Sequence, residues 1–145
     1  MIDFEIGVLI DRRIEEVFDY VSNPINLPYW QTMLLEITPL TPGSVVVGSK
    51  FSTKGEMMGR KIEGQMEITH LQPPASFGYQ AKVGPMQING LISLKSAGTG
   101  AKVTLKLHGE PGGLFKLAEG LLLNQVKNQM QANLDRLKTI LEAGA

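Results

Sequence analysis

The sequence predicts a single α+β domain, residues 1–145, in which a curved antiparallel sheet of about seven strands wraps around a long C-terminal helix. Three observations favour this class. A chain of 145 residues has the usual size of one domain. Short apolar runs recur between turn signals from about residue 33 to residue 109. Residues 114–143 then contain no proline and only one glycine, and their apolar residues follow a helical period.

The N-terminal segment predicts a strand, a helix and a short helical turn. Apolar and polar residues alternate over residues 2–10, as in a strand with one face in water. Asp11 is expected to cap the next helix, in which Ile14, Val17, Phe18 and Val21 have the spacing of one helical face. Asn23-Pro24 ends this helix, and the two prolines within residues 24–30 leave room for only a short turn.

The central region predicts six strands joined by short links. The turn signals are Thr41-Pro42-Gly43, Gly55 to Gly59, Gln72-Pro73-Pro74, Gly84-Pro85 and Gly98-Thr99-Gly100. Four rows are expected to face inward: Ile62, Gly64, Met66, Ile68; Phe77, Tyr79, Ala81, Val83; Ile88, Gly90, Ile92, Leu94; and Ala101, Val103, Leu105, Leu107. Because such short links cannot contain crossover helices, the sheet should be antiparallel.

The C-terminal segment, Leu114 to Ala143, predicts one long helix. With a rise of ~1.5 Å per residue it would be on the order of 45 Å long, so it should cross the whole concave face of the sheet. Its apolar stripe consists of Leu123, Val126, Met130, Leu134, Leu137 and Leu141.

Composition excludes several classes of partner. Lys plus Arg and Asp plus Glu both number 14, so no net charge would attract nucleic acid or an anionic membrane. The first residues lack a leader pattern, and no apolar run is long enough to span a bilayer, so we expect no integral membrane association. The chain has no cysteine, which excludes disulfides and thiolate chemistry. The expected location is the cytoplasm.

The order strand, helix, short helix, six strands, long helix is similar to the START-like (SRPBCC) helix-grip fold, which includes polyketide cyclase/dehydratase-like proteins. The local motif is the segment from Val8 to Trp30, in which a strand leads through Asp11 into a helix with Val17-Phe18, followed by Asn23-Pro24. Many members have Asp where this chain has Asn23. The resemblance covers the whole chain and implies a ligand cavity rather than a particular reaction.

Other motifs do not predict chemistry. The segment from Gly43 to Lys50 has the glycine spacing of a phosphate-binding loop, but its Ser and Lys are in the wrong order and a strand follows. His70 and His108 lie on separate predicted strands without an acidic partner motif, so no metal is expected. No nucleophile elbow is present either. We therefore expect no cofactor and assign no catalytic residue.

Ten residues are candidates for lining the cavity: Tyr29, Trp30, Phe51, Met66, Tyr79, Ile88, Val126, Gln129, Met130 and Asn133. Tyr29 and Trp30 could contact a ligand at the mouth, and core packing is the alternative for Trp30. Gln129 and Asn133 lie one helical turn apart beside the apolar stripe. They either meet a polar atom of the ligand inside the cavity or face solvent.

The leading functional hypothesis is noncovalent binding or transport of a hydrophobic small molecule, such as a lipid, an isoprenoid or an aromatic polyketide. It rests on the inward apolar rows, in which Gly64 and Gly90 would leave space, although glycines there also permit close packing. The second hypothesis is a cyclase or dehydratase, with Tyr79, Glu56 or Arg60 as the candidate acid or base. The third is a protein-interaction module that uses an apolar patch on the exposed sheet face. A homodimer is left open.

Overall fold

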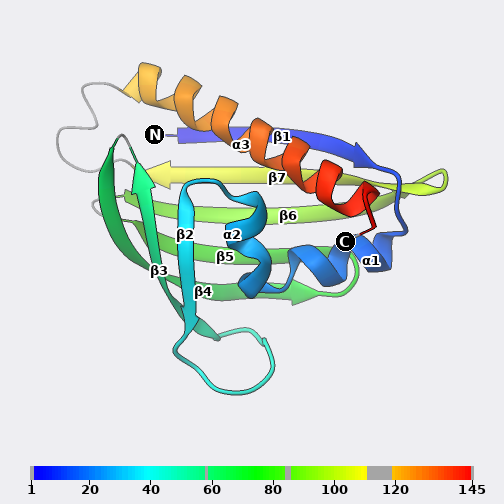
Figure 1. Ribbon diagram of the computed structural model, residues 1–145, viewed down its shortest axis with the longest axis horizontal. Coiled ribbons are helices and arrows are strands. Elements are labelled where there is room, and N and C mark those ends of the chain that lie inside the picture. Colours follow the sequence, from blue (N-terminus) through cyan, green and yellow to red (C-terminus); the bar gives the residue numbers. More distant parts are fainter. Residues whose placement is uncertain (1, 58, 84–85, 111–118, 145) are drawn as a thin grey trace.

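The computed structural model describes residues 2–57, 59–83, 86–110 and 119–144, and it has the predicted α+β architecture. Its elements are β1 (Ile2–Ile10), α1 (Ile14–Val21), the 3₁₀ turn η1 (Pro24–Asn26), α2 (Leu27–Trp30), β2 (Leu34–Pro39), β3 (Lys50–Met57), β4 (Arg60–Gln72), β5 (Ser76–Val83), β6 (Met86–Ala97), β7 (Gly100–Glu110) and α3 (Glu119–Glu142). Figure 1 shows the long strands curving behind α3 and the short helices.

The sheet contains seven strands in the order β1-β7-β6-β5-β4-β3-β2, and neighbouring strands pair antiparallel throughout. The first and last strands in sequence are therefore neighbours, and the other pairs are sequential hairpins. Hairpins need no crossover helix, and the described residues between β2 and β7 contain none. The prediction of an antiparallel sheet is confirmed.

Helix α3 closes the concave side of the sheet, where it packs against β1 and α2 (Figure 1). Val126, Leu134, Leu137 and Leu141 of its predicted stripe are buried, and Leu123 and Met130 pack against the same core from partly buried positions. The predicted stripe is therefore the inward face of the helix. The predicted start at Leu114 lies outside the described residues.

The end of α3 is attached to the segment that leaves β1. The Glu142 carboxylate accepts a hydrogen bond from the backbone N–H of Asp11 at 2.8 Å and another from Lys138 at 2.7 Å. The backbone carbonyl of Glu142 also accepts a hydrogen bond from Arg12 at 2.6 Å. The hydrogen bonds from Lys138 and from the Asp11 N–H, together with the positive charge of Lys138, hold the pKa of the Glu142 carboxyl below its usual value. The C-terminal end of α3 is thus attached to the segment that follows β1.

The expected Asp11 cap was wrong. The residue that precedes α1 is Arg13, and it makes no capping hydrogen bond from its side chain. The Asp11 side chain instead accepts a hydrogen bond from the Thr99 hydroxyl at 3.3 Å, because β1 and the β6–β7 turn end side by side. The first helix is held mainly by the burial of Val17, Phe18 and Val21.

The expected turn from Gly55 to Gly59 is shorter than predicted, because β3 continues to Met57 and β4 starts at Arg60. Gly55 is a strand residue that pairs with both Leu34 and Ile62. A Cβ atom at Gly55 would collide with the carbonyl oxygen of Met33, so glycine is needed there for close strand approach rather than for a turn.

Large exposed apolar side chains are distributed over several elements. They are Leu9 on β1, Ile25 on η1, Tyr29 on α2, Leu35 on β2, and Leu40, Val46 and Val47 in the segment between β2 and β3. The outward rows of the central strands carry mainly polar residues, as in the exposed Lys61, Glu63 and Gln65. Such a distribution does not favour the hypothesis of an apolar docking patch on the sheet face.

Candidate functional site

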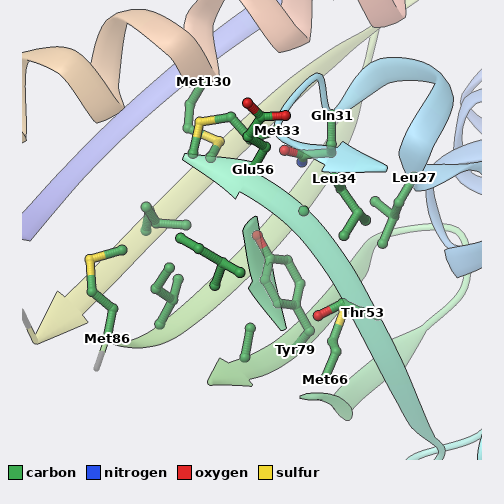
Figure 2. A pocket seen from close by; sticks show the side chains of 15 residues that line it. Leu27, Gln31, Met33, Leu34, Thr53, Glu56, Met66, Tyr79, Met86 and Met130 are labelled. Carbon is green, nitrogen blue, oxygen red and sulfur yellow. The ribbon is translucent and has the colours of Figure 1, made fainter. Parts of the chain in front are cut away.

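A cavity lies between the concave face of the sheet, α3 and the segment that joins α2 to β2. Its volume is about 140 Å³. Figure 2 shows the side chains around it. It is lined by Leu27, Gln31, Met33, Leu34, Thr53, Gly55, Glu56, Ile62, Met66, Tyr79, Ala81, Met86, Ile88, Leu107 and Met130. Its position inside the grip of sheet and helix matches the predicted location.

Methionine is concentrated at this cavity. Four of the seven methionines of the chain line it, namely Met33, Met66, Met86 and Met130. They come from the link between α2 and β2, from β4, from β6 and from α3, and they approach the same space (Figure 2). Thioether side chains are flexible, fill irregular space and make favourable contacts with aromatic rings. The wall can therefore adapt to an apolar guest and suits a flat aromatic one.

Tyr79 brings a hydroxyl group to this apolar wall. The residue lies on β5 opposite Gly90 of β6, and its ring covers the space that a Gly90 side chain would need. Burial raises the pKa of the Tyr79 hydroxyl to about 12, because the phenolate form would lose its hydration. Among the described residues this hydroxyl has no hydrogen-bond partner. It stays protonated at neutral pH and can donate to a guest.

The glycines of the inward rows do not create the cavity, contrary to the expected effect of Gly64 and Gly90. The Tyr79 ring occupies the space beside Gly90, and a Cβ atom at Gly64 would collide with the Lys82 carbonyl oxygen. Neither glycine lines the cavity. They permit close packing, which was the alternative reading, and Gly90 allows Tyr79 to lie flat against the sheet.

Three further polar groups lie on the lining: the Gln31 amide, the Thr53 hydroxyl and the Glu56 carboxylate. Thr53 is buried on β3, and Gln31 is half-buried at the end of α2. Glu56 is exposed to solvent and so marks the mouth of the cavity, where its carboxylate lies among Met33, Met130 and Gln31 (Figure 2). Polar groups are thus few and placed at separate points around an apolar interior, as in small-molecule sites.

Four of the ten candidate residues line the cavity: Met66, Tyr79, Ile88 and Met130. The other six lie elsewhere: Tyr29, Trp30, Phe51, Val126, Gln129 and Asn133. Tyr29 is 63% exposed on α2, while Trp30 beside it is fully buried in the core. Core packing was the alternative given for Trp30, and it is the arrangement observed. Phe51 and Val126 are also buried core residues and do not line the cavity.

Asn133 is buried but satisfied by protein groups, so neither predicted alternative for it was right. Its Oδ1 accepts hydrogen bonds from the Thr32 backbone N–H at 3.3 Å, the Thr32 hydroxyl at 3.1 Å and Gln129 Nε2 at 3.1 Å. Its Nδ2 donates to Gln31 Oε1 at 3.0 Å. Gln129 also donates to the Thr32 hydroxyl. The pair connects α3 to the α2–β2 segment and does not line the cavity.

The residues that sequence reasoning missed come mostly from the α2–β2 segment and from strand ends. Leu27, Gln31, Met33 and Leu34 reach the cavity because α2 and the start of β2 fold over the open side of the sheet. No periodicity in the sequence shows where such a short segment will pack. The one available signal was residue type, because Met33 and Met86 belong to the methionine group described above.

The site offers little acid–base chemistry. Glu56 is its only carboxylate among the described lining residues, and Arg60 lies exposed at the start of β4 away from the lining. Within the described ranges, no group of three or more His, Asp or Glu side chains could hold a metal ion. His70 lies 2.6 Å from the Ser76 hydroxyl, across the β4–β5 hairpin and away from the cavity. No described helix is long and apolar enough to cross a membrane.

Comparison with solved structures gives the same fold over nearly the whole chain. An aromatase/cyclase from Streptomyces sp. R1128, ZhuI, superposes with a TM-score of 0.76 at 12% identity, covering 97% of this chain and 93% of that one. DR_A0006 from Deinococcus radiodurans gives 0.73 at 17% identity, with all of both chains covered. The di-domain aromatase/cyclase BexL gives a TM-score of 0.72 at 20% identity. The superposition covers 98% of this chain and 47% of BexL.

Sequence comparison places the chain in a family. No curated protein sequence matches it significantly. Residues 1–142, in contrast, match the family described as polyketide cyclase / dehydrase and lipid transport. The match runs from the first strand to the end of α3, so it includes every element that surrounds the cavity. The chain therefore belongs to the polyketide cyclase / dehydrase and lipid transport family.

Proposed function

We propose that the protein binds or carries a hydrophobic small molecule in the cavity between the sheet and α3. The observation that carries the proposal is an apolar internal cavity whose wall includes the Tyr79 hydroxyl, which has no hydrogen-bond partner among the described residues. A fully packed core would not leave such a space, and most buried hydroxyls have a hydrogen-bond partner. Lipid transport in the family description agrees with this role.

The cavity volume limits what can be enclosed. A dry protein cavity of about 150 Å³ accepts benzene, whereas sites for drug-sized ligands measure roughly 300 to 1,000 Å³. At about 140 Å³, this cavity has room for one aromatic ring or a short branched chain. A longer lipid, isoprenoid or polyketide would place only one end inside the cavity, and the rest of the molecule would extend out through the mouth beside Glu56.

Filling the cavity tests the proposal. Ala81 lines the wall on β5, and its small side chain leaves space that a phenylalanine would occupy. A neutral one-ring compound near 100 times its dissociation constant should stabilise the wild-type protein by about 2.7 kcal/mol. For Ala81→Phe the same compound should give little stabilisation, and thermal unfolding measures both.

The proposal fails if the wild-type protein gains no stability from any compound of this size. It also fails if Ala81→Phe gains as much as the wild type, because the compounds would then bind elsewhere. Folding of the variant is checked by its cooperative unfolding without ligand.

A second candidate is an enzyme of the cyclase or dehydratase kind, favoured by the structural similarity to two aromatase/cyclases. Tyr79 is the group best placed to act, since among the described lining residues it is the one whose hydroxyl has a raised pKa. With a pKa of about 12 it would donate a proton or a hydrogen bond rather than act as a base at neutral pH.

Tyr79→Phe separates the two functions. For a carrier, the change removes one hydrogen bond and should leave the affinity for purely apolar ligands within about twofold. For an enzyme that uses the hydroxyl, turnover should fall by ~100-fold or more. Turnover of a polyketide-like substrate that persists unaltered in Tyr79→Phe would eliminate Tyr79 as the acid.

A further inference from the structure

The orientation of one cavity amide is fixed by a chain of hydrogen bonds that starts at a backbone group. The Thr32 backbone N–H can only donate, so the atom of Asn133 that faces it at 3.3 Å must be the oxygen, Oδ1. The amide nitrogen of Asn133 then points the other way. It lies 3.0 Å from the Gln31 amide and must donate to it.

The Gln31 amide is thereby oriented too. Its oxygen, Oε1, is held by Asn133, which leaves its Nε2 as the atom without a hydrogen-bond partner in the described part of the chain. Gln31 lines the cavity, and its amide end lies near the mouth beside Met33 and Leu34 (Figure 2). The protein therefore presents this amide to a guest as a donor and not as an acceptor.

The other polar groups of the wall agree with a guest that accepts hydrogen bonds. The hydroxyls of Tyr79 and Thr53 can both donate, and neither has a partner among the residues that the structure describes. The described lining contains no cation, and Glu56 supplies a negative charge at the mouth. A carboxylate guest would enter without a counter-ion and beside a like charge, which is unfavourable in an apolar site.

We propose that the cavity selects a neutral, ring-sized guest that carries an acceptor oxygen, and that the Gln31 amide, set by Asn133, recognises this oxygen. The inference rests on the proposed function, because it concerns the same cavity. It goes further by naming the guest class and by excluding carboxylates such as fatty acid anions from the interior. Gln31 becomes the specificity-determining residue, and Asn133 a positioning residue.

Matched one-ring probes test Gln31 directly. Acetophenone carries a carbonyl oxygen, and cumene has nearly the same shape without it. In NMR titrations Gln31→Leu should weaken acetophenone roughly tenfold and leave cumene little changed, because only the former loses a hydrogen bond. Gln87→Leu is the matched control: Gln87 is exposed on β6 between Met86 and Ile88, which line the cavity, and the substitution should change neither affinity.

Asn133→Asp tests the positioning role with a readout that mere loss of structure would not give. A carboxylate at this position still accepts from Thr32 and Gln129 but cannot donate to Gln31. The Gln31 amide should then turn its Nε2 toward the introduced carboxylate and its oxygen toward the cavity. The affinity ratio of acetophenone to N-methylaniline, a neutral probe that donates through N–H, should fall roughly tenfold.

Benzoate tests the exclusion of anions. It should bind the wild-type protein at least roughly tenfold more weakly than acetophenone, and Glu56→Gln should narrow that gap. The inference is overturned if Gln31→Leu weakens cumene as much as acetophenone, if Asn133→Asp leaves the probe ratio unchanged, or if benzoate binds as well as acetophenone. Each of these results still requires that a neutral probe binds the protein, whereas failure of every neutral probe to bind contradicts the proposed function itself.

Discussion

Replacing Leu134 by alanine should lower the free energy of unfolding by about 2 to 5 kcal/mol. Leu134 is fully buried on α3, where the inward stripe of the helix meets the sheet. Truncation there removes apolar burial and also opens a void that the surrounding helix and strands cannot fill without moving. Urea denaturation, analysed with a common m-value, measures the change.

Leu9→Ala is the matched control, because Leu9 is 56% exposed on the outer face of β1. We expect its cost to stay within about 0.5 kcal/mol, as for most surface substitutions. Equal changes for the two variants would mean that α3 does not close the core through Leu134.

Asn133→Leu should destabilise the protein by about 1 to 3 kcal/mol, the usual penalty for leaving buried polar groups without partners. The leucine cannot accept from Thr32 or donate to Gln31, so the connection between α3 and the α2–β2 segment is lost. Because Gln31 and Met33 of this segment line the cavity, the site should loosen as well. Chemical denaturation measures the first effect, and the affinity for cumene measures the second.

Asn128→Leu provides the comparison on the same helix. Asn128 is exposed, so an identical change of side chain there should alter stability only slightly. A loss for Asn133→Leu no larger than that for Asn128→Leu would show that the hydrogen bonds of Asn133 contribute nothing to the fold.

The fold was predictable because its signals are periodic and redundant. Alternation over β1, β4, β6 and β7 sets the inward face of each strand, and slipping by one residue would bury charges such as Glu63. The stripe of α3 was equally clear. Asp11 misled the prediction because a capping residue is recognised by type alone, while its side chain and its backbone N–H contact Thr99 and Glu142, which are distant in the sequence.

The candidate site was predictable only in part, for a related reason. Met66, Tyr79 and Ile88 were placed correctly because strand alternation fixes which side chains face the concave side. Gln31 and Asn133 were not, because their roles depend on how a four-residue helix, α2, packs against α3. A sequence shows that an amide borders an apolar stripe, but it does not show which neighbouring chain will satisfy that amide.

The central claim is that a neutral guest occupies the cavity bounded by four methionines, and methyl NMR tests it most directly. With ¹³C-methyl-labelled methionine, the signals of Met33, Met66, Met86 and Met130 can be assigned by single Met→Leu variants. Saturating acetophenone should shift all four signals together along one binding curve, since the four side chains line one cavity. A guest that binds yet leaves these four signals in place would contradict the account, because it would have to bind somewhere else.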